Sequence, residues 1–156
     1  MRTKLVLGFI LVVALAVIGC GGKKAEQAES TTPATPPAAA PAADWVAPPD
    51  LDKGPRAGEG PVDEALATEG EKLFTARGCV ACHAFGKKVI GPDLKGVAMQ
   101  RTAAWMEAQI LHPDKMTQQD PVAKDLLAQY KTQMTNQGLT ADQAKAVVEY
   151  IKKAGK

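Results

Sequence analysis

The chain has 156 residues and a formal net charge of +2. This length fits one domain with appendages. The lysines and arginines are not clustered among aromatic residues, and a charge this small gives no reason to expect a polyanion. The sequence therefore indicates no nucleic-acid partner.

The first twenty residues are typical of an exported lipoprotein. Arg2 and Lys4 precede an apolar run over 5–18, which has the length of a signal-peptide core and is short for a membrane span. A small residue and Cys20 follow, and this order resembles a bacterial lipobox, in which the cysteine is lipidated and becomes the first mature residue. We expect a lipoprotein signal peptide over 1–19 and lipidation of Cys20. In the alternative, Cys20 is a stray thiol beside an uncleaved anchor; both interpretations place the rest of the chain outside the cytoplasm.

A linker is expected to follow the lipidated cysteine, over 20–62. Residues 21–43 are rich in alanine and proline and contain no aromatic or large aliphatic side chain. They cannot bury enough apolar surface to offset the entropy of ordering, so we expect this stretch to be disordered. The segment 44–61 is less uniform. Its Trp45 and Leu51 could dock on the folded domain or on a partner, and more linker fits the composition equally well.

From residue 63 onward the sequence has helical periodicity and no convincing strand pattern. Leu66, Gly70 and Phe74 fall on one face of a first helix, which Gly78 is placed to end. Three further helices are expected: from Thr102 to the residue before Pro113, from Asp120 through Tyr130, and from Thr140, in a capping box with Gln143, through Ile151. Residues 63–156 are therefore predicted to form one small all-α domain, whose thin core needs a staple or an embedded cofactor.

Cys79, Cys82 and His83 form a C-x-x-C-H motif, the attachment signature of haem c. At this spacing two thiols can form thioethers to the two vinyl groups of one porphyrin, and the adjacent imidazole reaches the iron from one face. A zinc site would need a second pair of ligands, and only His112 remains. A thioredoxin-like pair would need a βαβ pattern, which is absent, and a disulfide across three residues would constrain little. The motif predicts one covalently bound haem c.

With this motif in place, residues 63–156 resemble the class I cytochrome c family. The segment Gly91-Pro92-Asp93-Leu94 after the motif carries part of the resemblance. In the family such a proline lies beside the proximal histidine, and a nearby backbone carbonyl accepts the imidazole N–H, which makes the ring a better donor. The resemblance therefore implies a small fold of about four helices wrapped around one haem, with His83 as proximal ligand and Pro92 beside it.

The first and last helices carry the rest of the resemblance. In the family these helices cross at close range over a glycine, which implies a crossing formed by Gly70, Phe74, Val147 and Tyr150. The sequence departs from the family in one respect. Phe74 precedes Cys79 by five positions, one more than in the commonest spacing, which leaves the end of the first helix open.

The resemblance also implies an axial methionine in the loop before the last helix, and Met134 occupies that loop. Met116 is the main competitor, because we expect it in an irregular loop after Pro113. The remaining candidates are expected elsewhere: Met106 in the core, Met99 at the surface, and His112 as a solvated or capping residue at a helix end. Thioether ligation would give a moderately positive reduction potential.

The resemblance implies a monohaem electron carrier that is not an enzyme, and the lipobox adds that this carrier is anchored to a membrane. It would exchange single electrons with respiratory partners by outer-sphere transfer, as a monomeric haem domain facing the periplasm or the outer face of the cytoplasmic membrane. Lys87, Lys88 and Lys95 could steer an acidic partner or simply be solubilising lysines. The alternatives are a fixed subunit of a larger membrane oxidoreductase and, less favoured because the motif lies near the start of the domain, a gas-binding haem sensor.

Overall fold

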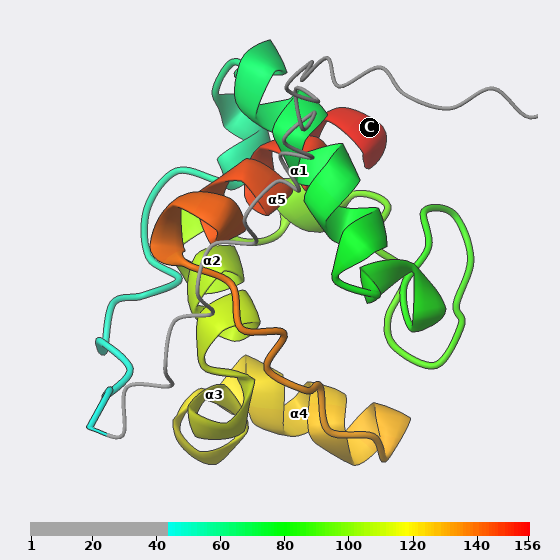
Figure 1. Ribbon diagram of the computed structural model, residues 1–156. Coiled ribbons are helices and arrows are strands. Elements are labelled where there is room, and N and C mark those ends of the chain that lie inside the picture. Colours follow the sequence, from blue (N-terminus) through cyan, green and yellow to red (C-terminus); the bar gives the residue numbers. More distant parts are fainter. Residues whose placement is uncertain (1–43) are drawn as a thin grey trace, which may run out of the picture. The chain divides into compact units, whose positions relative to one another are not determined.

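The computed structural model describes residues 44–156, and within this range the chain contains five α-helices and no strand (Figure 1). The helices are α1 Glu64–Ala76, α2 Ala103–Leu111, α3 Pro113–Gln119, α4 Pro121–Tyr130 and α5 Ala141–Ala154, with short 3-10 turns η1 Ala57–Glu59, η2 Cys79–Ala81 and η3 Val97–Met99. The predicted all-α class is confirmed. The expected signal peptide, Cys20 and the linker through residue 43 lie outside the described residues. From residue 44 onward, no helix is both long and apolar enough to cross a membrane.

The helices begin where the sequence places their caps. The Thr102 hydroxyl accepts a hydrogen bond from the Trp105 N–H (3.0 Å) at the start of α2. The Asp120 carboxylate accepts one from the Ala123 N–H (2.9 Å), with proline as the first residue of α4. Thr140 begins α5 in the expected capping box. Each such cap satisfies backbone donors that the helix leaves open, and contributes about 1 kcal/mol.

Helix α3 was not predicted from the sequence, and the prediction that Met116 lies in an irregular loop is wrong. Met116 lies within α3, and its side chain is fully buried. The proline at position 113 ends α2 as expected, but it also opens the next helix, because a proline at the first helical position needs no hydrogen-bond donor. His112 lies at the corner between α2 and α3.

Helices α1 and α5 cross at Gly70, as the resemblance implied (Figure 1). A Cβ atom at this position would lie 2.5 Å from the carbonyl carbon of Ala146 and 2.9 Å from the Cβ of Tyr150. The rings of Phe74 and Tyr150 lie 5.3 Å apart beside the crossing. Glycine is therefore required here, because a side chain would separate the two backbones.

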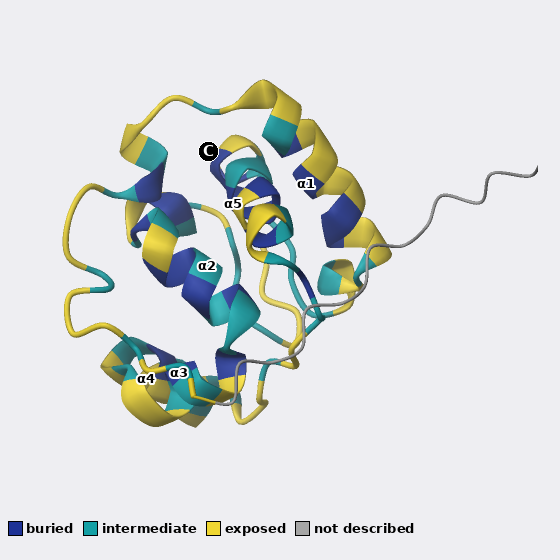
Figure 2. Cartoon of the chain, turned by 60° about the vertical axis from the view of Figure 1, so that its left-hand side comes forward, coloured by how far each residue is buried: buried dark blue, intermediate teal, exposed yellow. Residues whose placement is uncertain are grey.

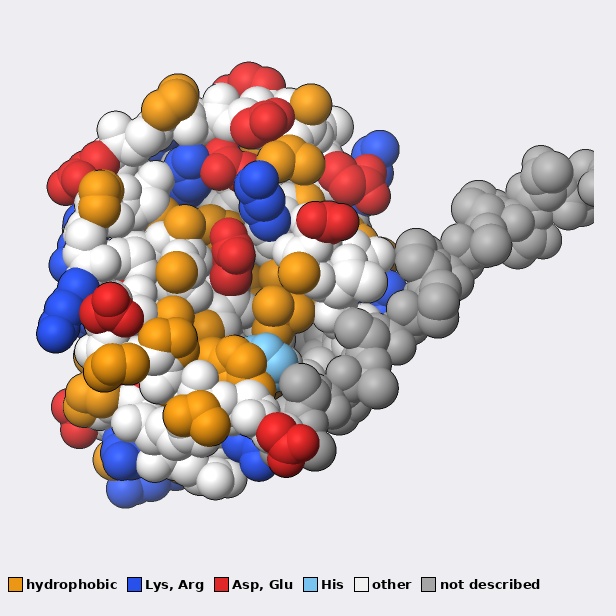
Figure 3. Space-filling model, turned by 90° about the vertical axis from the view of Figure 1, so that its left-hand side faces the viewer, with side chains coloured by type: hydrophobic (Ala, Val, Ile, Leu, Met, Phe, Trp, Pro, Cys, Tyr) orange, Lys and Arg blue, Asp and Glu red, His pale blue; other side chains and the backbone are white. Residues whose placement is uncertain are grey.

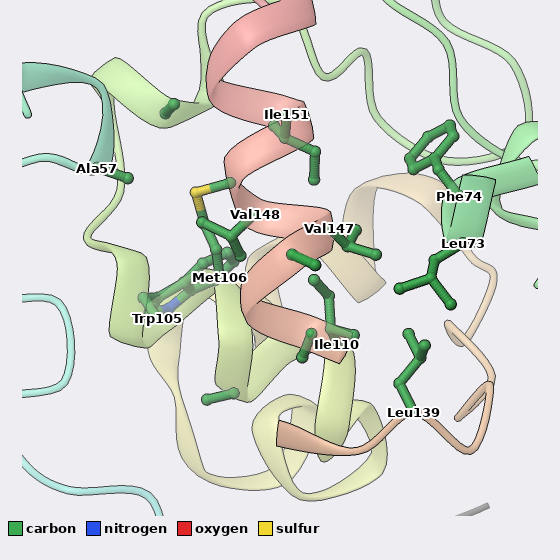
Figure 4. Packing of buried hydrophobic residues seen from close by; sticks show 14 of the residues in the cluster. Ala57, Leu73, Phe74, Trp105, Met106, Ile110, Leu139, Val147, Val148 and Ile151 are labelled. Carbon is green, nitrogen blue, oxygen red and sulfur yellow. The ribbon is translucent and has the colours of Figure 1, made fainter. Parts of the chain in front are cut away.

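Helices α1, α2 and α5 each carry buried residues (Figure 2), and their apolar side chains converge on one core (Figure 4). Leu139, which lies just before α5, packs against this core. The helical members are Leu73 and Phe74 from α1, Trp105, Met106 and Ile110 from α2, and Val147, Val148 and Ile151 from α5. The haem motif follows α1 directly and the Met134 loop precedes α5 directly, so this core fixes the ends of both segments.

Residues 44–59, which we call the strap, pack against the helices. The sequence left open whether this segment docks or continues the linker, and the structure shows that it docks on the domain. The expected linker therefore does not extend to residue 62. Trp45 stacks on His112, with ring centroids 4.4 Å apart and an interplanar angle of 17°. The Thr102 hydroxyl donates to the Leu51 carbonyl (2.7 Å). The folded part of the chain therefore includes residues on the N-terminal side of α1.

Asp52 is the main polar contact of the strap. Its carboxylate accepts hydrogen bonds from the guanidinium groups of Arg56 (2.9 Å) and Arg101 (2.6 Å) and from the backbone N–H of Thr102 (3.0 Å). The Ala57 N–H also donates to the Arg101 carbonyl (2.9 Å). Charge-assisted bonds of this kind are stronger than neutral ones, so the strap is held by more than apolar contact.

Candidate haem site

The haem motif forms a tight turn directly after α1. Gly78 has a φ of 75°, a left-handed conformation that glycine adopts without strain, and it turns the chain out of α1 into η2. The N–H groups of Cys82 (3.1 Å) and His83 (2.9 Å) both donate to the Cys79 carbonyl. One turn therefore presents both thiols and the imidazole.

Cys79 and Cys82 form no disulfide, and both side chains are partly exposed. Before the haem is attached, burial raises the pKa of the Cys79 thiol; a backbone hydrogen bond acts in the opposite direction, and the nearby Cys82 raises the pKa further. No cluster of three or more His, Cys, Asp and Glu side chains that could hold a metal ion occurs within residues 44–156.

The imidazole of His83 is fixed by one hydrogen bond. Its Nδ1 lies 3.0 Å from the carbonyl oxygen of Pro92. Because a carbonyl oxygen can only accept, Nδ1 carries the proton, and Nε2 keeps its lone pair for a metal. The resemblance implied a backbone carbonyl near this ring, and the structure has that of Pro92 in this place. A carbonyl acceptor makes the imidazole a stronger donor and fixes its orientation.

The loop that brings Pro92 to the imidazole closes back on the motif. The Gly91 N–H donates to the Cys82 carbonyl, and the Leu94 N–H donates to the Ala84 carbonyl, both at 2.9 Å. A Cβ atom at Gly91 would lie 2.6 Å from Cε1 and 3.0 Å from Nδ1 of His83. The ring therefore stands against bare backbone, and position 91 admits only glycine without displacing it.

Met134 lies in the irregular segment 131–140, between α4 and α5, and is partly buried. Three uncharged amide side chains hold this Met134 loop or its sulfur. Gln133 Nε2 donates to the Pro113 carbonyl (3.1 Å), Asn136 Nδ2 donates to the Leu111 carbonyl (2.7 Å), and Gln109 Nε2 lies 3.8 Å from the Met134 Sδ. The corner between α2 and α3 thus supports the loop that carries the thioether.

The other ligand candidates lie in different environments. Met106 is buried in the core, as expected, and Met99 is 57% exposed. Met116 is buried within α3. His112 is stacked on Trp45, and burial lowers its pKa, while Asp114 acts in the opposite direction. Met134 is therefore the candidate that combines an irregular loop, partial burial and a polar contact to its sulfur.

Two orphaned polar atoms test whether the interior fits a haem. Trp105 Nε1 and Gln109 Oε1 are the buried side-chain nitrogen and oxygen atoms without a hydrogen-bond partner in the described part of the chain. They belong to residues four apart on α2, and residues at this spacing lie on one face of a helix. Buried polar groups in folded proteins are normally paired, so this face is suited to a further group with polar substituents, as a haem has. The donor set of two thiols, an imidazole and a thioether also matches haem c.

A family model described as Cytochrome c matches residues 67–155. The chain belongs to the cytochrome c family. The expected class I resemblance is confirmed at this level, and with it the cofactor: the domain carries one haem c, covalently bound through Cys79 and Cys82.

Individual relatives agree with the family match. Cytochrome c-551 of Stutzerimonas stutzeri is 53% identical over 34 residues, which are 22% of this chain and 33% of that protein. Cytochrome c-551 of Pseudomonas denitrificans is 55% identical over 29 residues, 19% of this chain and 35% of that protein. The chain therefore matches about a third of the length of these curated relatives. Among solved structures, cytochrome c from Rhodothermus marinus is 36% identical with a TM-score of 0.58, covering 65% of this chain and 97% of that one.

Sequence reasoning missed two contributors to the site. Gln109 was not singled out, although a polar residue four positions after Trp105 on an otherwise apolar helix face is a readable signal. Asn136 was also missed, and its role depends on a carbonyl 25 residues earlier in the chain, which no local pattern reveals.

Proposed function

We propose that this cytochrome c carries single electrons between redox proteins outside the cytoplasm, with His83 and Met134 as the axial ligands of its haem iron. The observation that supports this most directly is the His83 ring, whose Nδ1–H is held by the Pro92 carbonyl so that Nε2 is free to ligate. The haem supplies a one-electron iron couple. The chain supplies covalent attachment, orientation and ligands.

Each ligand has a distinct effect on that couple. The Pro92 carbonyl strengthens donation by His83. The Met134 thioether is a weaker donor than a second imidazole, so it raises the potential, and we expect a moderately positive value. If His83 and Met134 both bind the iron, no position on it would remain for a substrate. This favours a carrier over an enzyme or a gas sensor.

The surface around the attachment motif has the composition of a docking face. Val80, Val89 and Ile90 are exposed, and they belong to the motif and to the loop that follows it. Lys87 is exposed beside them, and Lys88 is held over the ring of Tyr130, 4.3 Å from the centroid. We propose that the partner is an acidic redox protein. It would contact the exposed apolar side chains of this surface, and the lysines beside them would attract its carboxylates.

The formal net charge of +2 is too small to attract an acidic partner strongly over a long distance. The face in Figure 3 mixes acidic, basic and apolar side chains, so it carries no large field of one sign. Any electrostatic selectivity must then arise from local charges. Replacing Lys87 with glutamate should slow electron exchange with the partner more at low salt than at high salt.

The anchor and location also belong to this proposal. We propose that Cys20 is lipidated, that residues 20–43 tether the domain to a bacterial membrane, and that the haem domain is monomeric and faces the periplasm or the outer face of the cytoplasmic membrane. In cells that express Cys20→Ser, the cytochrome should leave the membrane fraction. A second experiment uses the wild type, whose membranes are solubilised gently. If the cytochrome migrates alone, it is a separate carrier. If it comigrates with other subunits, the result favours the alternative of a fixed subunit.

Ligand substitution tests the ligation. Met134→Ala in the exported holoprotein should abolish the methionine-to-iron charge-transfer band, lower the potential and allow carbon monoxide to bind the reduced protein. Met116→Ala is the matched control, because it removes an equally large buried thioether in α3. It should lower stability while the band persists. The reverse result would identify Met116 as the ligand and contradict the proposal.

A further inference from the structure

The corner between α2 and α3 carries the Met134 loop on two backbone carbonyls. The Leu111 carbonyl accepts a hydrogen bond from Nδ2 of Asn136 (2.7 Å), and the Pro113 carbonyl accepts one from Nε2 of Gln133 (3.1 Å). A single residue separates these two carbonyls in the chain. The positions of both acceptors therefore depend on the backbone of that one residue.

His112 is the residue between the two carbonyls, and its side chain does not cap the helix that it begins. It occupies the N-cap position of α3, with φ −133° and ψ 49°, and it makes no side-chain cap hydrogen bond. Its imidazole instead stacks on Trp45 of the strap, with 4.4 Å between the ring centroids and 17° between the planes. An N-cap side chain normally holds the first turn of its own helix. This corner is held instead by a partly buried aromatic residue from a distant part of the chain.

The strap also holds the other end of α3. The Ala47 N–H donates to Oε1 of Gln119 (2.8 Å), which is the last residue of this helix. Between the two strap contacts, the Thr117 hydroxyl lies 2.9 Å from Oε1 of Gln133, the residue next to Met134. A helix of seven residues is too short to be stable by itself. Its place in the fold, and with it the place of the Met134 loop, therefore depends on contacts of this kind.

We propose that Trp45 is a positioning residue, whose stack on His112 fixes the corner between α2 and α3 and thereby keeps the Met134 sulfur at the iron. The inference rests on the proposed ligation by Met134. For the sulfur to leave the iron, the Met134 loop must move together with the two carbonyls that hold it or break away from them. The stack opposes movement of the corner, so it slows dissociation of the methionine. Trp45 itself need not touch the haem.

Displacement of the methionine by imidazole measures this effect in the oxidised, exported, full-length holoprotein. At saturating imidazole, the charge-transfer band disappears at the rate at which the methionine leaves the iron. An aromatic pair changes an equilibrium constant by about two- to twelvefold. Trp45→Ala should therefore speed the loss of the band by about this factor. Trp45→Phe keeps an aromatic ring at this position and should restore a rate near that of the wild type.

Leu51→Ala is the matched control in the same holoprotein. Leu51 also belongs to the strap and packs against the core, but its carbonyl accepts from Thr102, which caps the opposite end of α2 from the corner. Both alanine variants should lower the guanidinium concentration at which the holoprotein unfolds. Only Trp45→Ala should also speed the loss of the methionine, because a strap that merely stabilised the fold would act equally through both residues.

The outcomes separate this inference from the proposed function. A faster loss of the band that is confined to Trp45→Ala and reversed in Trp45→Phe supports the role of Trp45. An unchanged rate in Trp45→Ala, or equally fast loss in Trp45→Ala and Leu51→Ala, would overturn that role while leaving ligation by Met134 intact. If Met134→Ala keeps the charge-transfer band, ligation itself is wrong, and this inference falls with it.

Discussion

Substituting Gly91 with alanine should weaken the hold of the chain on its proximal histidine. The new Cβ would lie 2.6 Å from Cε1 of His83, whereas carbon atoms in contact stay about 3.5–4.0 Å apart. The ring must therefore move by about 1 Å. Its 3.0 Å hydrogen bond to the Pro92 carbonyl cannot survive that displacement unchanged. Losing the bond costs about 1 kcal/mol, and overpacking a filled site costs about 1–3 kcal/mol.

The expected total for Gly91→Ala is a loss of about 2–4 kcal/mol in the free energy of unfolding. Guanidinium unfolding of the holoprotein, followed by haem absorbance, measures it. Gly60→Ala is the control, because a Cβ there meets nothing within 4 Å and the backbone φ is −85°. If Gly91→Ala unfolds at the same denaturant concentration as Gly60→Ala and the wild type, then the His83 ring is not held as the structure shows.

Further substitutions test the crossing, the strap and two shifted pKa values. Gly70→Ala should lower stability by about 1–3 kcal/mol in calorimetry, because its Cβ would overlap the backbone at Ala146. Trp45→Ala should expose His112 and return its pKa, measured by NMR, toward 6.5. Because burial lowers the pKa of His112, the wild type should lose more stability than His112→Gln as the pH falls below 6.5. Burial raises the pKa of Glu107, with Lys145 opposing this and Glu149 adding to it, so its ionised form is disfavoured in the fold. Urea unfolding of Glu107→Gln should therefore show a gain over the wild type that grows as the pH rises above 4.5.

Features governed by neighbouring residues could be predicted from the sequence. The caps at Thr102, Asp120 and Thr140 each join a side-chain oxygen to an N–H group three positions later. The local sequence alone therefore indicates them. The thioether motif has a spacing set by the porphyrin itself. The crossing at Gly70 could be predicted only from the family resemblance, because the local sequence does not indicate which helix approaches this glycine.

The missed features depend on partners that are distant in the chain or on weak local signals. The strap is held by Asp52, whose partners Arg101 and Thr102 lie about fifty positions away. Helix α3 has only seven residues, too few for a clear apolar periodicity, and its opening proline was interpreted only as the end of α2. Gln109 stands out as a polar residue on an otherwise apolar face of α2, but its neighbour Met134 lies 25 positions away in the chain, so no local pattern shows what it contacts.

Electron transfer by this protein requires a covalent bond between one haem and two cysteines of the chain, and the mass of the denatured exported protein tests for that bond directly. After acid extraction that removes non-covalent haem, the wild type should keep the mass of one haem, located on the peptide that contains Cys79 and Cys82. The double variant with alanine at both positions should keep none. A wild-type protein that is folded yet carries two free thiols and no haem would contradict covalent haem attachment and the proposed electron transfer.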